Sequence, residues 1–442
     1  MRDAERRHGS TPSRMLIRGL LMAASVSSYS AVAAESPDTE TRVAQLERRL
    51  DESAKVIEAL TTRVRELETR LAIAASAPNA SAPDGSDTSE RLTSVERAIG
   101  DIAAAQSSET ESGLKIHGFA DVGAGTRSTL DPDHKGFTVG SLDLYMTPEL
   151  GARTMALVEL NFEAEETGGL AVDLERLQLG YQLGDSTKLW LGRFHTPYGY
   201  YNNAFHHGQQ IATSLRRPKF LAFEDQGGVL PAHTVGLWVN GSRRFGDGRW
   251  TYDAFIGNAQ EIHEGVIDMV QGGKLRSDAS VGGNVGFHLG GKLEGFTAGL
   301  SYLAADIEDD ALSPHRTRLN NYGLYTVLDT DHWESIVELY RFDDHELSAV
   351  GVAHRSTAGF GQLAYRFERF TPYARYERAA FDQADPFFAA QSAGGSYRRG
   401  ALGVRFDLAL SSALKLELGH TVETDRLRNE FSDTLFQYAV RF

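Results

Sequence analysis

The last nine residues of the chain, 434–442, constrain its fold more than any other stretch. Bulky side chains occupy every second position, at Phe436, Tyr438, Val440 and Phe442, and the chain ends on the last of them. Side chains of a β-strand point to opposite faces in turn, so these four residues share one apolar face. The residues between them are mostly polar or small. The pattern predicts a strand that separates an apolar environment from a polar one.

The same alternation recurs through residues 114–442, for example at 156–162, 250–256 and 402–408. Between these strand-like segments, short turns alternate with long polar loops. The longest loop covers 195–232. Membrane barrels of the bacterial outer membrane alternate their connections in this way. Counting predicts an all-β transmembrane barrel of about 16 antiparallel strands, with both ends on the short-turn side. A barrel of this size leaves a water-filled lumen.

The composition of the 442 residues agrees with such a barrel. The chain has 44 glycines, 41% hydrophobic and 10% aromatic residues, which suits many strands separated by turns. After the first 34 residues, the sequence has no run of about 18 or more apolar residues that would predict a membrane helix. A soluble sandwich or propeller is the alternative, although no blade-length repeat is visible. The lack of cysteine excludes thiol chemistry, and the net charge of -15 argues against nucleic-acid partners.

The N-terminal residues follow other patterns. A short apolar stretch from Met15 ends at small residues before position 35, which predicts a cleaved export signal beginning at Met1 or Met15. From Val43 to Leu71 apolar residues recur at alternating spacings of three and four, the pattern of a coiled coil. A lone helix of this length is marginal in water, so the pattern implies partner chains, as a dimer or a trimer.

The predicted domain organisation follows from these patterns. It comprises a signal peptide (1–34), a periplasmic α-helical coiled coil (35–73), a flexible linker (74–90), a short second coiled-coil or linker segment (91–113) and the barrel (114–442).

Two stretches resemble a known family. The terminal Phe442, with Tyr438 four residues earlier, resembles the C-terminal assembly signal of outer-membrane β-barrel proteins, with Val440 on the same face. The run Gly-Arg-Phe-x-x-Pro-Tyr-Gly at 192–199 is similar to a strand-to-loop segment of Gram-negative outer-membrane porins, nearest the branch of phosphate-selective porins O and P. The resemblance covers the barrel in architecture and only these two stretches in motif.

The resemblance implies a homotrimer in which a long loop, here 200–231, folds into the lumen and narrows it. It also implies outer-membrane lipids and the barrel assembly machinery as partners, while the coiled coil joins three barrels or reaches the cell wall. The implied function is passive diffusion of small hydrophilic solutes or ions. The alternatives are an occluded barrel acting as a tether or adhesin, and an outer-membrane hydrolase. We find no catalytic motif, so neither an enzyme nor a cofactor is expected.

Charged side chains on the strands are expected in the lumen, because each costs about 2 to 4 kcal/mol when it faces the midplane of the bilayer. In the long loop, the charges could instead form an internal network that only holds the loop in shape. A metal site at His206 and His207, with His195 and His233 nearby, is disfavoured because adjacent histidines project differently. The predicted pore-lining and constriction residues are Arg176, Arg193, Arg216, Arg217, Lys219, Glu224, Asp225, Arg366, Arg375 and Arg405.

Overall fold

The computed structural model describes most of the region predicted to form the barrel. The described residues are 116–126, 136–148, 150–164, 169–205, 210–224, 226–268, 279–311, 314–347, 351–425 and 429–442. The predicted signal peptide, coiled coil, linker and second N-terminal segment lie outside the described residues, as do His206, His207 and Asp225. The chain divides into two compact units after Ser108, and every described residue belongs to the second unit.

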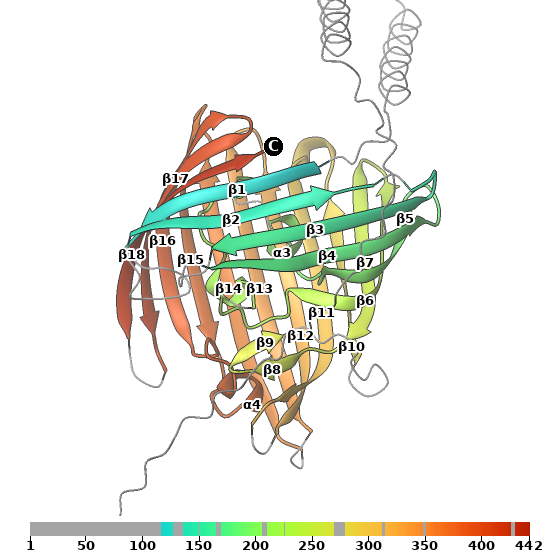
Figure 1. Cartoon of the computed structure of the whole chain (residues 1–442), viewed down its shortest axis with the longest axis vertical. Helices are drawn as coiled ribbons and strands as arrows, with labels where there is room; N and C mark the ends of the chain where they lie inside the picture. Colours follow the sequence, from blue (N-terminus) through green and yellow to red (C-terminus); the bar gives the residue numbers. More distant parts are fainter. Residues whose placement is uncertain are drawn as a thin grey trace, which may run out of the picture. The chain divides into compact units, whose positions relative to one another are not determined.

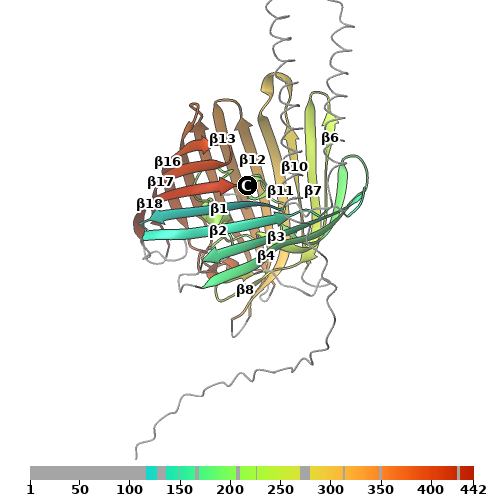
Figure 2. The same ribbon diagram turned by 45° about the horizontal axis from the view of Figure 1, so that its top comes forward.

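A closed barrel of 16 antiparallel strands forms this unit, which confirms the predicted architecture. The barrel closes where β1 (Ile116–Gly125) pairs with β18 (Glu430–Arg441), and β1 also pairs with β2 (Gly136–Met146). In Figures 1 and 2 the first strands cross in front of the later ones, as the tilt of barrel strands requires. The other barrel strands are β3 (Thr154–Ala164), β4 (Leu170–Gln182), β5 (Thr187–His195), β6 (His233–Phe245), β7 (Gly248–Asn258), β10 (Ala279–His288), β11 (Phe296–Asp309), β12 (Arg316–Asp329), β13 (Trp333–Glu346), β14 (Ala353–Tyr365), β15 (Phe370–Ala380), β16 (Tyr397–Ala409) and β17 (Ser412–Glu423).

Short elements occupy several connections. The hairpin of β8 (Glu261–His263) and β9 (Val266–Asp268) lies between β7 and β10, and β8 pairs in parallel with the end of β11. Two four-residue helices, α3 (Tyr201–Ala204) and α4 (Pro386–Ala389), and the 3-10 turns η1 (Lys219–Leu221) and η2 (Gly291–Leu293) are the remaining elements of the described residues. Among the described residues, no helix is long and apolar enough to cross a membrane.

The outer face of the barrel is apolar. On β18 and directly after it, Phe436, Tyr438 and Phe442 are 44%, 37% and 60% exposed, whereas Gln437 and Ala439 are buried inside, as the alternation predicts. Leucines cover the middle of the outer face on many strands. Aromatic pairs gather near the short turns, namely Trp333 with Tyr365, Phe370 with Phe406, and Trp250 with Phe287. An apolar band bordered by aromatic rings is the surface that a barrel presents to a bilayer.

Several strands continue further toward the long loops than the sequence predicts. The apolar alternation ends before the strands do, because β11 continues to Asp309, β13 continues to Glu346, and β14 begins at Ala353. Arginine and aspartate occupy outward positions on these strand ends, so the apolar alternation stops while the backbone pairing continues. The barrel wall therefore extends beyond its apolar band on the loop side.

The terminal residue takes part in closing the barrel. The amide of Phe442 donates to the Gly118 carbonyl at 3.0 Å, and the Gly118 amide donates back at 2.9 Å. The Phe442 ring covers Gly118 so closely that a Cβ there would lie 2.6 Å from a ring carbon. The last residue thus fastens the end of the chain to β1.

Deleting Phe442 is expected to lower the yield of folded barrel in membranes several-fold, because both hydrogen bonds and the ring contact at the closing strand pair are lost. Heat-modifiable electrophoretic mobility of membrane fractions measures that yield. Phe442→Tyr, which keeps the ring and the backbone, serves as the control and should assemble normally. Normal assembly of the deletion variant would remove the assembly role of this residue.

Candidate pore and its constriction

The described residues between β5 and β6, namely 196–205, 210–224 and 226–232, fold into the barrel and are called the lumen segment below. Many of its aromatic and aliphatic side chains are buried, with Tyr201 and Phe220 only 2% and 1% exposed, whereas Ile211 is exposed. Both rings pack against wall residues, since Tyr201 meets Phe360 edge-on at 5.6 Å and Phe220 meets Tyr340 at 5.5 Å. Helix α3 lies within the ring of strands in Figure 1. The segment is thus a second, inner layer of the barrel.

The entry of the segment depends on Gly199. Its φ of +63° is a backbone conformation that glycine adopts readily and other residues rarely do. A Cβ at this position would lie 2.0 Å from the Tyr340 hydroxyl and 2.6 Å from a Glu338 carboxylate oxygen. The next two amides, of Tyr200 and Tyr201, donate to the other oxygen of Glu338. The last glycine of the 192–199 motif therefore allows the chain to turn onto the wall.

Acidic wall side chains accept further backbone amides of the segment. Glu377 on β15 accepts from the amide of Lys219 at 2.7 Å. Glu417 on β17 accepts from the amides of Leu215 and Arg216 at 3.3 and 3.4 Å. Glu338, Glu377 and Glu417 are fully buried. Each carboxylate therefore satisfies peptide groups that water satisfies in an exposed loop.

Basic wall side chains hold the carbonyl groups of the segment. Arg375 on β15 donates to the carbonyl of Arg216 at 2.6 Å, and Arg405 on β16 donates to the carbonyl of Ala212 at 3.0 Å. Lys415 donates to a third carbonyl at 3.2 Å. Because the wall supplies both donors and acceptors, the irregular backbone of the segment is stable inside the barrel.

The segment extends to the short-turn end of the barrel. The Gln210 side chain donates to the carbonyl of Leu410, which lies in the turn between β16 and β17. The Thr213 hydroxyl donates to Glu334, the second residue of β13, at 2.7 Å. The attachments named so far all lie on β13 to β17, or on the turn between two of these strands.

A buried ion network joins the wall strands behind the segment. Arg375 contacts Glu377 at 2.9 Å, and Arg399 contacts Glu417 at 3.1 Å and Asp433 at 2.6 Å. These side chains are at most 4% exposed. Charges removed from water require close partners, so the network is stable only as a complete set. It links β15 to β18.

Arg217, one of the predicted constriction residues, binds other residues of the lumen segment. Arg217 donates to the carbonyls of Phe205 and Leu221, both at 2.7 Å, and lies over the Phe223 ring at 4.4 Å. Burial disfavours its charged form and lowers the pKa of Arg217 below the usual arginine value. These contacts agree with the internal-network interpretation of the loop charges. A pore-lining role of Arg217 stays a prediction.

Glu224 closes the exit of the segment. Its carboxylate accepts from the amides of Ala232 and His233 at 2.6 and 2.9 Å. Burial alone would raise its pKa, but the charge of His233 and these hydrogen bonds keep the pKa of Glu224 below its usual value. Lys219 contacts the partly exposed Glu423 at 2.9 Å. Both residues fasten the segment to the strands beside it.

A separate charged cluster lies on β3 to β6. The β3–β4 register shifts between Glu159 and Leu160, so that Glu175 is the extra residue of a bulge in β4. Such a bulge re-aims the neighbouring side chains. Arg176 pairs with Glu159, while Arg193 approaches Glu175 at 3.6 Å and Asp173 at 3.2 Å. His233 bridges this cluster to the lumen segment, because its ring contacts Glu175 at 2.7 Å and Glu224 at 3.3 Å.

The structure thus brings only some of the predicted site residues together. Arg216, Arg217, Lys219 and Glu224 belong to the lumen segment, and Arg375 and Arg405 bind it from the wall. Arg176 and Arg193 belong to the β3–β6 cluster, and Asp225 lies outside the described residues. Arg366 lies at the short-turn end, where it contacts Asp329 at 2.7 Å and Glu334 at 3.0 Å.

Two wall tyrosines that bind the segment are absent from the predicted set. The hydroxyl of Tyr373 accepts from the amide of Leu215 at 3.1 Å, and that of Tyr397 accepts from the amide of Phe220 at 3.0 Å. Tyr373 shares its face of β15 with Arg375, so the strand alternation already placed it inward. Nothing in the sequence indicated that its hydroxyl meets the loop.

No protein-family model matches the chain, and no curated protein matches it. Solved structures do. An anion-selective porin from Comamonas acidovorans is 15% identical, with a TM-score of 0.51 over 75% of this chain and 99% of that chain. OmpT expressed in the outer membrane of Vibrio cholerae is 9% identical, with a TM-score of 0.49 over 76% and 99%. The outer-membrane channel DcaP of Acinetobacter baumannii is 11% identical, with a TM-score of 0.48 over 75% and 99%. At such low identities, the similarity to the Comamonas porin supports a shared barrel fold and nothing more. The similarities to the other two structures, with TM-scores below 0.5, carry no further argument.

Proposed function

We propose that the chain is an outer-membrane porin, a water-filled channel for passive diffusion of small hydrophilic solutes or ions. The observation that carries the proposal is the contrast between the two faces of one wall. The outer face carries leucines and aromatic rings, whereas the inner face carries charged groups that hold an inserted segment. The apolar outer face can border hydrocarbon, whereas the charged inner face can border only water or polar protein.

In this proposal solutes pass between the lumen segment and the strands on the opposite side, β1 to β4. The inward charges that border this path include Glu163, Asp173, Arg176 and Arg193. Opposite charges at the narrowest level would set the ion preference, with Arg216 and Lys219 on the segment side. No catalytic step is included in the proposal, and no cofactor.

The finer parts of the proposal concern assembly. We include an exported chain with a signal peptide at 1–34, a homotrimer, and a coiled coil at 35–73 that joins subunits or reaches the cell wall. The barrel assembly machinery would recognise Tyr438, Val440 and Phe442. The Gly-Arg-Phe-x-x-Pro-Tyr-Gly motif is what relates the chain to the phosphate-selective branch.

A second candidate function rests on the reach of the lumen segment. Because Gln210 binds the turn at Leu410, the segment extends along the full height of β16. A barrel occluded in this way would serve as a tether or adhesin and would conduct no ions.

Conductance of the purified protein in a planar bilayer separates the two candidates. For the porin, we expect stable current steps in molar potassium chloride, and reversal potentials in a salt gradient then report the ion preference. Boiled protein, whose barrel is unfolded, provides the control and should give no steps. Folded, heat-modifiable protein that inserts without steps would contradict the porin and favour the occluded barrel.

A further inference from the structure

Two arginines lie side by side on the outer wall near the long loops. Arg378 on β15 and Arg398 on β16 are directly opposite each other, and both point outward and are exposed. Like charges in directly opposite positions of neighbouring strands destabilise the pairing. Among the described residues, neither guanidinium has an acidic group within ion-pair distance. The two guanidinium groups therefore form an exposed patch of positive charge that could bind an anion from outside the chain.

Neighbouring outward arginines differ in this respect. Arg318 contacts Asp306 at 2.7 Å, and Arg341 and Arg355 both contact Asp343, at 2.9 and 3.0 Å. Outward arginines near the loop side of β12 to β14 are thus neutralised by aspartates of the chain. Arg378 and Arg398 carry the same charge at the same end of the barrel without such partners.

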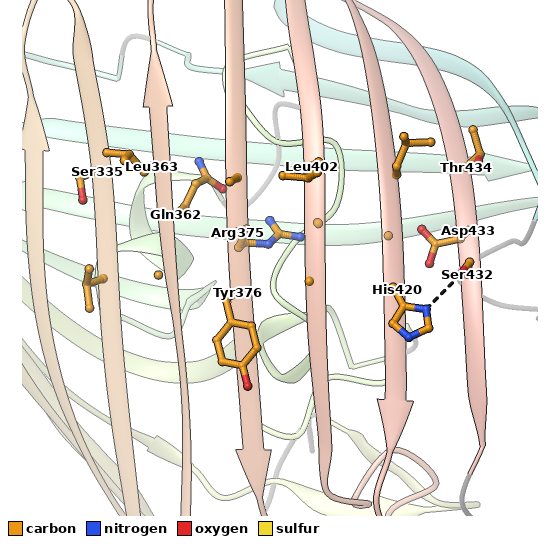
Figure 3. A pocket seen from close by; sticks show the side chains of 17 residues that line it. Ser335, Gln362, Leu363, Arg375, Tyr376, Leu402, His420, Ser432, Asp433 and Thr434 are labelled. Carbon is orange, nitrogen blue, oxygen red and sulfur yellow. Dashed lines mark hydrogen bonds between the residues drawn. The ribbon is translucent and has the colours of Figure 1, made fainter.

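Directly below this pair, toward the short turns, the outer wall is hollowed (Figure 3). The hollow has a volume of about 810 Å³ and is mostly apolar. Leu363, Leu402 and Leu418 border it, together with Tyr376, two residues from Arg378, and Gly400, two residues from Arg398. A Cβ added at Gly400 would meet no atom within 4 Å, so the missing side chain opens the hollow.

The order of these features along the wall matches the order of groups in a membrane lipid. The cationic pair lies toward the loops, at the level where headgroups border the apolar band, and the apolar hollow lies next to it at the level of the acyl chains. Guanidinium groups bind phosphate oxygens in two-pronged fashion. His420, bonded to Ser432 at 3.0 Å, places polar groups on the far rim.

We propose that this surface of β14 to β18 is a binding site for a phosphorylated lipid of the surrounding leaflet. The phosphate lies between Arg378 and Arg398, and one acyl chain lies in the hollow beside Gly400. The proposal rests on the placement of the barrel in a membrane and goes beyond the channel function. It commits to a lipid and not to a second copy of the chain, because the charged part and the apolar part follow each other along the membrane normal.

The test uses native mass spectrometry of the full-length protein in detergent, titrated with lipid A, a glycolipid that carries two phosphates. We expect Arg378→Ala/Arg398→Ala to bind it about 30-fold more weakly, or ~2 kcal/mol, from about two surface arginines near an anionic headgroup. Arg378→Lys/Arg398→Lys should recover part of the affinity. Gly400→Leu, which fills the hollow and keeps both charges, should also weaken binding.

Arg243→Ala, which removes an outward arginine at the short-turn end of β6, is the control and should bind as the unmodified protein does. Electrophoretic heat modifiability shows that each variant is folded. Unchanged binding in Arg378→Ala/Arg398→Ala would overturn the proposal. The proposal would also be overturned if inorganic phosphate alone competed equally well with lipid A. The same holds if the arginine variant differed from the unmodified protein only by the loss of subunit association. Lipid binding in detergent does not require an open channel, so this outcome is independent of the conductance result.

Discussion

Replacing Glu417 with alanine is expected to lower the free energy of unfolding by about 3 to 5 kcal/mol, the cost of leaving a buried ionic partner unpaired. Glu417 is fully buried and contacts Arg399 at 3.1 Å. It also accepts the Tyr373 hydroxyl at 2.7 Å and two amides of the lumen segment. Its loss therefore leaves charges, a phenol and backbone groups unsatisfied at once.

Denaturant unfolding in detergent micelles, followed by tryptophan fluorescence, measures this change. Glu423→Ala is the matched control on the same strand, because Glu423 is partly exposed and its pair with Lys219 is screened by water. Its expected cost is below about 1 kcal/mol. Equal costs for both variants would show that the network does not support the barrel.

Replacing residues 200–231 with a short glycine-serine linker is expected to raise single-channel conductance several-fold. A barrel of this strand number leaves an aqueous channel when nothing fills it. His195 and His233 are directly paired across β5 and β6, so a short linker spans the gap. The wall charges that held the segment become hydrated, which charged groups tolerate readily.

A point variant provides a milder form of the same experiment. Gly199→Val is expected to displace the entry of the segment, because its Cβ would lie 2.0 Å from the Tyr340 hydroxyl in a backbone conformation that valine disfavours. Gly395→Val is the control, since a Cβ there meets nothing within 4 Å. Planar-bilayer recordings of both variants measure the effect. Conductance unchanged by the linker would place the segment away from the path of ions.

The strand alternation made the barrel predictable because it reports which side of a wall each residue faces. Phe436 and Tyr438 could be placed outside on this ground alone, and the turns gave the number of strands. The alternation failed where its premise failed. The bulge at Glu175 changes the facing of its neighbours, and the outward Arg318 and Asp343 look like loop residues although their backbones are paired.

The site was predictable in position but not in contact. The resemblance to porins implied that the long loop after His195 is inserted into the lumen, and the charges on the strands indicated a polar interior. The amides of the segment are accepted by Glu338, Glu377 and Glu417. Which wall residues lie opposite the segment is decided only when the barrel has closed. Peptide groups are the same at every position of a chain, so no residue pattern announces these bonds.

The attachment of the lumen segment also bears on the order of folding. The segment precedes its anchors in the chain by long intervals, 137 residues from Tyr201 to Glu338 and 202 from Leu215 to Glu417. When the segment leaves the ribosome, the wall that will hold it has not yet been synthesised. Contacts over such separations form late and slowly. The inner layer of this barrel can therefore be complete only once β17 is in place.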